Sequence, residues 1–255
     1  MKKIKFISAL ILAAFLTVAQ NGASFEFKYT SSKGMTGNMN VKHSEFGSKS
    51  EVKMQSPKAP GGGMTMVSLI KKDTPDLIYI INDANKSYSE MKKGSSEGKE
   101  DTHTYTVKKI GTEKVAGYNC VHSTVTNEKG EVSEMWMSKD VADYSKYSET
   151  FNSSKKFGSG KQELAMKAAG CEGFPVKIIH KAKDQEGDVT MELVKFEKKS
   201  FSKSDFEVPA GYTKSAGGPA GMGMPAGMKT QEEIMKMTPE ERAKYVEELK
   251  KQYGK

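Results

Sequence analysis

The side chains best suited to proton transfer near neutral pH are four histidines at separate points of the chain: His43, His103, His122 and His180. A hydrolase or transferase needs a nucleophile beside such a base, and none of the four stands in a recognisable catalytic motif. Residues 158–161, Gly-Ser-Gly-Lys, look like part of a phosphate-binding loop, but Lys155 occupies a position where that loop requires glycine. We therefore interpret this stretch as the start of a helix and predict that the protein is not an enzyme.

Methionine is the compositional excess with possible chemistry, because its thioether is a soft ligand that suits Cu(I). The chain has 16 methionines, and several stand in Met-x-Met pairs: Met64/Met66, Met135/Met137, Met222/Met224 and Met235/Met237. Residues two apart on a strand share a face, so the first two pairs would each present two sulfurs together. Methionine is also an adaptable residue of cores and cavities, and we favour that interpretation, with no cofactor and no metal site.

The N-terminus has the layout of a secretory signal peptide. Three lysines within the first five residues precede an apolar run from Phe6 to Val18. Residues 1–19 form the predicted signal, with cleavage between Ala19 and Gln20 or, alternatively, between Ala23 and Ser24. The run is short for a bilayer span and no second one follows, so we expect no transmembrane segment in a mature periplasmic or secreted chain. With no cysteine near either cleavage point, we also expect no lipid anchor.

The charge of the chain is mixed rather than patterned for nucleic acid. The whole sequence carries 40 Lys and Arg against 32 Asp and Glu, and its formal charge falls from +8 to +5 when the three lysines of the signal are removed. Lysine is interleaved with acidic residues almost throughout, which is typical of a solvated surface. We find no arginine-rich or aromatic-interleaved patch, so nucleic acid is not an expected partner.

Two cysteines in an exported chain leave two alternatives open. A disulfide between Cys120 and Cys171 would close a loop of roughly 50 residues, worth about 4 kcal/mol in the chain-entropy model. In the other alternative, Cys120 is a small buried apolar residue on a strand and Cys171 is a loop residue after Gly170. Neither lies in a Cys-x-x-Cys motif that would indicate zinc or redox chemistry.

The elements that must position these residues are mostly strands. From Phe25 to Met137, apolar and polar residues alternate and are interrupted by turn clusters, which predicts antiparallel strands in a meander. Strands return over 174–181 and 189–201. Because the later strands resume after an interruption, the predicted class is α+β, dominated by one antiparallel sheet.

Two helices are predicted between these groups of strands. The first would have Asp140 as its N-cap and an apolar stripe: Val141, Tyr144, Tyr147 and Phe151. The second would follow Ser159 and end at Gly170, with one apolar face: Leu164, Ala165 and Ala168.

The C-terminal part differs sharply in composition. Residues 213–229 form a predicted linker rich in Gly, Pro and Met, and residues 230–255 contain a predicted C-terminal helix. Thr238 to Glu241 is a capping box with proline at the first helical position. Such a tethered helix could recruit a protein of the cell envelope, which is the alternative functional hypothesis.

Three short motifs carry a resemblance to a known family. They are Val115 to Cys120 followed by Glu134-Met135-Trp136, the strand Phe174 to Ile178, and the ending Phe206-Glu207-Val208-Pro209 with Gly211-Tyr212. Over residues 24–212 the chain resembles DUF4412, a family of exported bacterial domains that is grouped with the LolA/LolB-like periplasmic lipoprotein carriers. Proline cannot donate to a strand ladder, so we expect this ending to close the last edge of the sheet, with Tyr212 packed back.

The resemblance implies a strongly curved, half-barrel sheet with both inserted helices on its concave face and an apolar cavity beneath them. It would be lined by apolar residues of the strands and helices: Met66, Leu77, Tyr79, Ile81, Met135, Met137, Tyr144, Leu164, Ile178 and Met191. The implied function is to bind or carry a lipid or another hydrophobic molecule without covalent chemistry.

Overall fold

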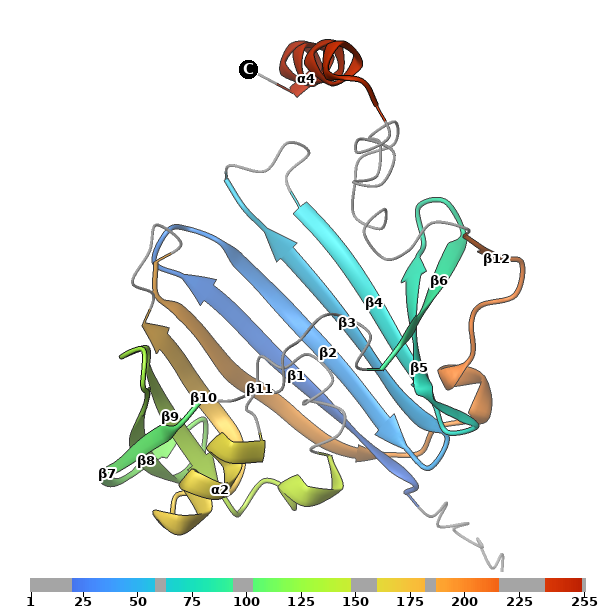
Figure 1. Cartoon of the computed structure of the whole chain (residues 1–255). Helices are drawn as coiled ribbons and strands as arrows, with labels where there is room; N and C mark the ends of the chain where they lie inside the picture. Colours follow the sequence, from blue (N-terminus) through green and yellow to red (C-terminus); the bar gives the residue numbers. More distant parts are fainter. Residues whose placement is uncertain are drawn as a thin grey trace, which may run out of the picture.

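The computed structural model describes residues 20–57, 63–93, 103–147, 160–181, 187–215 and 237–253, which form one curved sheet with a few short helices (Figure 1). The predicted signal peptide, Phe151 and most of the predicted linker lie outside the described residues. The strands are β1 (Gly22–Ser31), β2 (Thr36–Ser44), β3 (Gly47–Gln55), β4 (Gly63–Lys71), β5 (Thr74–Asn82), β6 (Ser87–Lys92), β7 (Tyr105–Val115), β8 (Tyr118–Asn127), β9 (Val132–Ser138), β10 (Phe174–Lys181), β11 (Val189–Lys199) and β12 (Thr213–Lys214).

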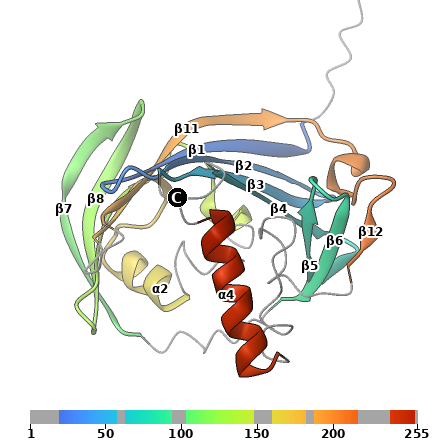
Figure 2. The same ribbon diagram turned by 90° about the horizontal axis from the view of Figure 1, so that it is seen from above.

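All twelve strands belong to a single open sheet. Its order is β12-β6-β5-β4-β3-β2-β1-β11-β10-β9-β8-β7, with every neighbouring pair antiparallel except β12 and β6. Viewed from above, the sheet forms an arch with α2 (Gly160–Ala168) on its concave side (Figure 2). The predicted strand-dominated α+β class with an unclosed antiparallel sheet is confirmed. The strand β12, which directly follows Tyr212, pairs with β6 at the edge of the sheet, where the sequence predicted that this ending would lie.

The main core lies on the concave face, where β1, β2, β10 and β11 meet the helical segments. Phe25 and Phe27 of β1 and Phe174 of β10 are at most 1% exposed, and the rings of Phe25 and Phe174 stack with centroids 4.9 Å apart. Alternate residues of β1 point inward, so their partners Met39 and Val41 on β2 join the same core. This period-two pattern is the one that predicted the strands from the sequence.

A second, smaller cluster lies on the opposite face of the sheet, and we call it the outer cluster: Val67, Leu69, Tyr79, Ile81 and Phe206, with Leu77 and Tyr212 packed against it. The strand register shows which face this is. Met39 of the main core pairs with Val52, and Val52 pairs with Met66, so Met66 is on the concave face. Side chains alternate along a strand, so Val67 of the outer cluster points to the opposite face. The 3-10 turn η2 (Lys203–Phe206) covers it. Leu77, Tyr79 and Ile81 therefore do not line the concave side, and that part of the predicted cavity is wrong.

The two inserted helical segments lie between β9 and β10, as predicted, but differ from expectation in detail. The first is, in its described part, a single 3-10 turn, η1 (Tyr144–Lys146), and Asp143 rather than Asp140 caps it by accepting a hydrogen bond from Ser145 N. Asp140 instead accepts one from Asn119 at 3.0 Å. The predicted N-cap was therefore three residues too early, because a neighbouring strand end engages that carboxylate.

The helix α2 ends as the sequence indicated. Gly170 has a positive φ of 63°, Gly170 N donates to Lys167 O, and Cys171 N donates to Met166 O at 2.8 Å. These two hydrogen bonds form a Schellman motif, for which glycine is the favoured residue. The helix faces the core with Met166 rather than with Leu164, which is 68% exposed.

The C-terminal helix α4 spans Pro239–Tyr253. Its first turn holds the predicted capping box, since Thr238 N donates to the Glu241 carboxylate at 2.7 Å and Glu241 N donates to Thr238 Oγ1 at 3.3 Å. Over the described ranges, no helix is long and apolar enough to cross a membrane.

Candidate functional site

An apolar pocket of about 370 Å³ lies between α2, η1 and the facing ends of β9 and β10. Its volume is in the range of sites that hold small molecules. The lining residues are Met135, Met137, Lys139, Ala142, Asp143, Tyr144, Ser145, Gln162, Glu163, Met166, Lys167, Glu172, Gly173 and Pro175. Most of its surface comes from apolar atoms, and its charged residues belong to the loops and the helix rather than to the sheet.

Three methionines form the inner wall of this pocket. Met135 and Met137 lie two apart on β9, and Met166 comes from α2; they are 3%, 7% and 3% exposed. Gln162 Nε2 donates to Met135 Sδ at 3.2 Å, and Ser123 Oγ donates to Met166 Sδ at 3.8 Å. An unbranched, polarizable side chain can change its rotamer to fit irregular contents, so this wall can adapt to different apolar ligands.

The rim of the apolar pocket is polar and partly neutralised. Lys139 Nζ contacts Glu172 Oε1 at 2.6 Å, and this hydrogen bond lowers the pKa of the Glu172 carboxyl. The other oxygen, Glu172 Oε2, is buried and accepts no hydrogen bond among the described residues. Across the pocket, burial raises the pKa of Tyr144 to about 12, so its ring is neutral at physiological pH.

A second cavity, of about 700 Å³, is lined by five lysines and a single carboxylate, and we call it the lysine pocket. It opens at one end of β1 to β4, and its lining residues are Gln20, Asn21, Gly22, His43, Ser44, Glu45, Gly47, Ser48, Ile70, Lys71, Lys72, Pro75, Lys93, Ser145, Lys146, Tyr147 and Lys198. Ala23 of the main core pairs with Lys198 on one side and His43 on the other, and His43 pairs with Ser48. Paired residues share a face, so Lys198, His43 and Ser48 place this pocket on the concave face. Ser145 of η1 lines both pockets.

The predicted lining residues are distributed over four environments. Met135, Met137 and Tyr144 line the apolar pocket, whereas Ile178 and Met191 are packed in the main core. Met66 shares the concave face but is 41% exposed, Leu164 points to solvent, and the three β5 residues belong to the outer cluster.

Sequence reasoning missed Met166, Gln162 and Pro175 as lining residues. The less exposed positions of α2 are Gln162, Ala165 and Met166, and Ala169 follows the helix on the same side. A polar residue begins this stripe, and Leu164 stands on the exposed face, so the apolar pattern of the helix is weak. The most apolar residue of the helix was therefore a misleading guide to its buried face.

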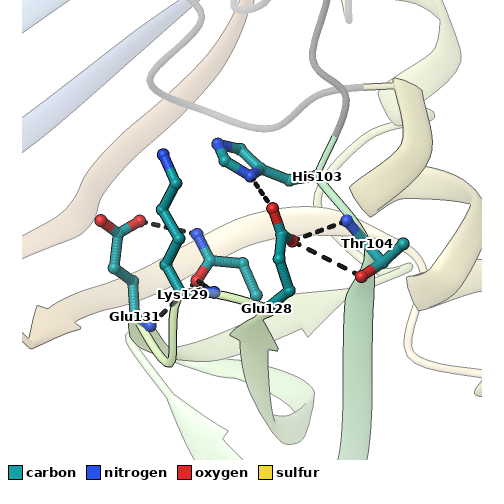
Figure 3. Close-up of polar contacts among 6 residues, drawn as sticks. His103, Thr104, Glu128, Lys129 and Glu131 are labelled. Carbon is teal, nitrogen blue, oxygen red and sulfur yellow. Dashed lines mark hydrogen bonds and ion pairs between the residues drawn. The ribbon is translucent and has the colours of Figure 1, made fainter.

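Of the four histidines, His43 lines the lysine pocket, and the other three line neither of the two pockets. Figure 3 shows His103 donating to Glu128, whose other oxygen accepts from Thr104 N at 2.8 Å; the pKa of Glu128 is lowered to about 2, chiefly by His103. These residues link the two strands of the β7–β8 hairpin at the end opposite its turn. His180 Nδ1 and Ser133 Oγ lie 2.7 Å apart, but neither residue lines the apolar pocket or the lysine pocket.

The two cysteines are free and buried in the structure. Cys120 Sγ donates to Tyr118 O at 3.5 Å and Cys171 Sγ to Ala169 O at 3.4 Å. Both side chains belong to the main core, and the disulfide stays a prediction.

Comparisons with known proteins give a family and a set of similar folds. The model of the family described as Domain of unknown function (DUF4412) matches residues 24–212. A search of curated proteins found no match. Among solved structures, an uncharacterized conserved protein of Thermus thermophilus is 7% identical, with a TM-score of 0.44 over 77% of this chain and 91% of its own.

Two further solved structures match at similarly low identity. The complex of Pseudomonas aeruginosa MucA and MucB has a matching chain that is 12% identical, with a TM-score of 0.38 over 75% of this chain and 56% of that one. A domain described as an outer membrane lipoprotein-sorting protein from Vibrio parahaemolyticus is 12% identical, with a TM-score of 0.28 over 74% of this chain and 91% of its own.

Proposed function

The chain belongs to the DUF4412 family, and we propose that this member is a non-catalytic binding or carrier protein that holds the acyl chain of a lipid in the apolar pocket. The observation that carries the proposal is the cavity of about 370 Å³ walled by Met135, Met137 and Met166. The pocket is open to solvent on one side and its surface is mostly apolar, so an acyl chain that enters it exchanges water for apolar walls. Each methylene group moved from water into it would contribute about 0.8 kcal/mol.

The pocket also offers one directional contact to a ligand. Glu172 Oε2 has no hydrogen-bond partner among the described residues, whereas Oε1 is paired with Lys139. A ligand with a hydroxyl or an amide N–H near its acyl chain would satisfy this oxygen. Lipids that carry such a donor should therefore bind better than plain hydrocarbons of the same length.

Export through the predicted signal peptide is part of the same proposal, with cleavage after Ala19. Asn21 exchanges two hydrogen bonds with the backbone of Phe201, at 2.9 and 3.0 Å, and Ala23 is fully buried in the main core. Cleavage after Ala23 would remove both residues from β1 and its entry. The intact mass of the exported protein should therefore correspond to an N-terminus at Gln20.

The direct test combines extraction with a matched pair of variants. Lipids extracted from the purified protein should be detected by mass spectrometry, and the neutral dye N-phenyl-1-naphthylamine should bind with enhanced fluorescence. Ala142→Phe places a ring in the apolar pocket and should abolish dye binding, whereas Ala168→Phe, on the exposed face of α2, should leave it unchanged. Thermal unfolding of both variants verifies that they are folded.

Two results would contradict the proposal. Equal dye binding by the wild type and by folded Ala142→Phe would show that the pocket is not the binding site. Binding of Cu(I) with protection of Met135, Met137 and Met166 from oxidation, without any binding of dye or lipid, would instead favour the thioether alternative.

A further inference from the structure

The lysine pocket concentrates positive charge that the described residues neutralise only in part. Lys71 Nζ is paired with Glu207 at 2.8 Å and with Asp73 at 3.9 Å, and Lys146 lies close enough to Asp143 to help lower the pKa of that carboxyl. Lys72, Lys93 and Lys198 form no ion pair within 4 Å in the described ranges. The only carboxylate in the lining is Glu45, which accepts a hydrogen bond from Asn21. A cavity lined by one sign of charge attracts the opposite ion, because its walls focus the field.

These lysines come from four separate parts of the chain. Lys72 lies in the turn after β4, Lys93 follows β6, Lys146 ends η1 and Lys198 is on β11. The fold therefore assembles the charge, which distinguishes it from the interleaved lysines of a solvated strand. His43 and Ser48, which line the pocket, are paired across the sheet and lie on the concave face, so the cavity belongs to the same face as the apolar pocket.

The turn η1 is the wall that the two pockets share. Tyr144 lines the apolar pocket, Lys146 and Tyr147 line the lysine pocket, and Ser145 lines both. Tyr147 fixes the turn against the sheet, since its ring lies edge-on to Phe25 at 5.0 Å and to His43 at 5.1 Å. The apolar pocket and the lysine pocket are therefore adjacent, because Ser145 lines both.

From this juxtaposition we infer that the ligand is a single amphiphile with an anionic headgroup, whose acyl chain occupies the apolar pocket while its phosphate or carboxylate lies in the lysine pocket. The inference rests on the proposed function, because it assigns the headgroup of the same lipid. A zwitterionic headgroup would bring a cationic group next to these lysines together with its phosphate, and a neutral headgroup would bring no counter-charge to them. We therefore assign the discrimination between anionic and zwitterionic headgroups to the lysine pocket.

The test uses two lysolipids with the same palmitoyl chain, lysophosphatidylglycerol and lysophosphatidylcholine, each below its micellar concentration. Their displacement of N-phenyl-1-naphthylamine from the purified chain gives the two affinities. We expect the anionic lipid to bind about tenfold more tightly, a factor that corresponds to about 1.4 kcal/mol. The difference should shrink with added salt, because exposed charges are screened.

A pair of double variants assigns this preference to the pocket. Lys146→Ser with Lys198→Ser should remove the preference for the anionic lipid, whereas Lys28→Ser with Lys108→Ser, which makes the same change in net charge on exposed strand positions, should retain it. Glycerol 3-phosphate, a headgroup without a chain, should not displace the dye at the concentrations used for the lipids.

Each unfavourable outcome has a separate meaning. Equal affinities for the two lysolipids would overturn the headgroup inference while leaving the proposed function intact, and failure of both lipids and dye to bind would overturn the proposed function. Equal loss of preference in both double variants would show that net charge, not the pocket, is responsible. If the protein binds anionic vesicles but no lysolipid, the ligand of the lysine pocket would be a membrane surface rather than a single lipid molecule.

Discussion

The two halves of the sheet bury opposite faces. Around β1, β10 and β11 the concave side is covered by η1 and α2 and forms the main core, whereas at β4 and β5 the opposite side is covered by η2 and forms the outer cluster. On the concave side of β4, Met64 and Met66 are 46% and 41% exposed. The comparison teaches that the covering segment, rather than the strand pattern, decides which face of this sheet becomes core.

Residues of β5 illustrate why the strand pattern is not sufficient. Leu77 to Ile81 is continuously apolar, so either alternation of its side chains could face a core. Phe206 of η2, only 1% exposed, packs against Tyr79 and Ile81 and so selects the outer side. On the concave side of this half, Met64 and Met66 belong to neither of the two clusters.

The largest effect is expected from the main core. Phe174→Ala removes a ring that is fully buried and stacked on Phe25 at 4.9 Å and Phe27 at 6.3 Å. Large-to-small changes of this kind cost about 3–5 kcal/mol, so urea unfolding should show this loss in a single cooperative transition. A loss below about 1 kcal/mol, within the ordinary range for surface sites, would show that the concave half is not the principal core.

The outer cluster should respond with a smaller and more local effect. Phe206→Ala empties the centre of a cluster that has fewer buried residues, and we expect a loss of about 3 kcal/mol. Amide hydrogen exchange should accelerate at Thr213 and Ser215, which donate to Lys86 and Tyr88 at the β6 edge. Exchange in β10 should change less, and equal acceleration in both places would indicate that the halves unfold as one unit.

The contrast between the halves also explains how far sequence reasoning reaches. Alternation located β1 to β11, and local chemistry located the glycine that ends α2 and the capping box of α4. These features depend on residues close together in the chain. The two-residue strand β12 is too short to produce a period, and its place beside β6 depends on the whole intervening fold.

The candidate site was only partly predictable for the same reason. Met135 and Met137 lie two apart on one strand, so their shared face could be read from the sequence. Met166 required knowledge of which side of α2 faces the sheet. The lysine pocket could not be foreseen, because Lys72, Lys146 and Lys198 are distant in the chain and each resembles an ordinary surface lysine until the fold brings them together.

Acid should weaken the outer cover before the main core. Asp205 accepts hydrogen bonds from Ser202 N at 3.0 Å and Ser202 Oγ at 2.9 Å, and these contacts lower the pKa of its carboxyl below the ordinary value of 3.8. A lowered pKa in the folded state stabilises the protein above the unfolded pKa, and this contribution is lost as the pH falls through the folded pKa.

The expected outcome is faster exchange at Thr213 and Ser215 below about pH 3.8, after correction for the intrinsic pH dependence of exchange. A cap of this type is worth about 1 kcal/mol, so Asp205→Asn should show the loosened state already at pH 7 and little further change on acidification. An unchanged profile in Asp205→Asn relative to the wild type would disconnect this carboxylate from the outer cover.

The smallest effect is expected at the two exposed methionines on the concave face of β4. Met64→Ser with Met66→Ser changes two side chains that are already 46% and 41% exposed and lie outside both clusters, so the free energy of unfolding should change by less than about 0.5 kcal/mol for each. Dye binding in the apolar pocket should also be unaffected, because neither residue lines it. Urea unfolding and dye titration of the same variant measure both quantities. A loss of more than about 2 kcal/mol would mean that this face is packed as firmly as the main core, and reduced dye affinity with normal stability would extend the binding surface from the pocket onto β4.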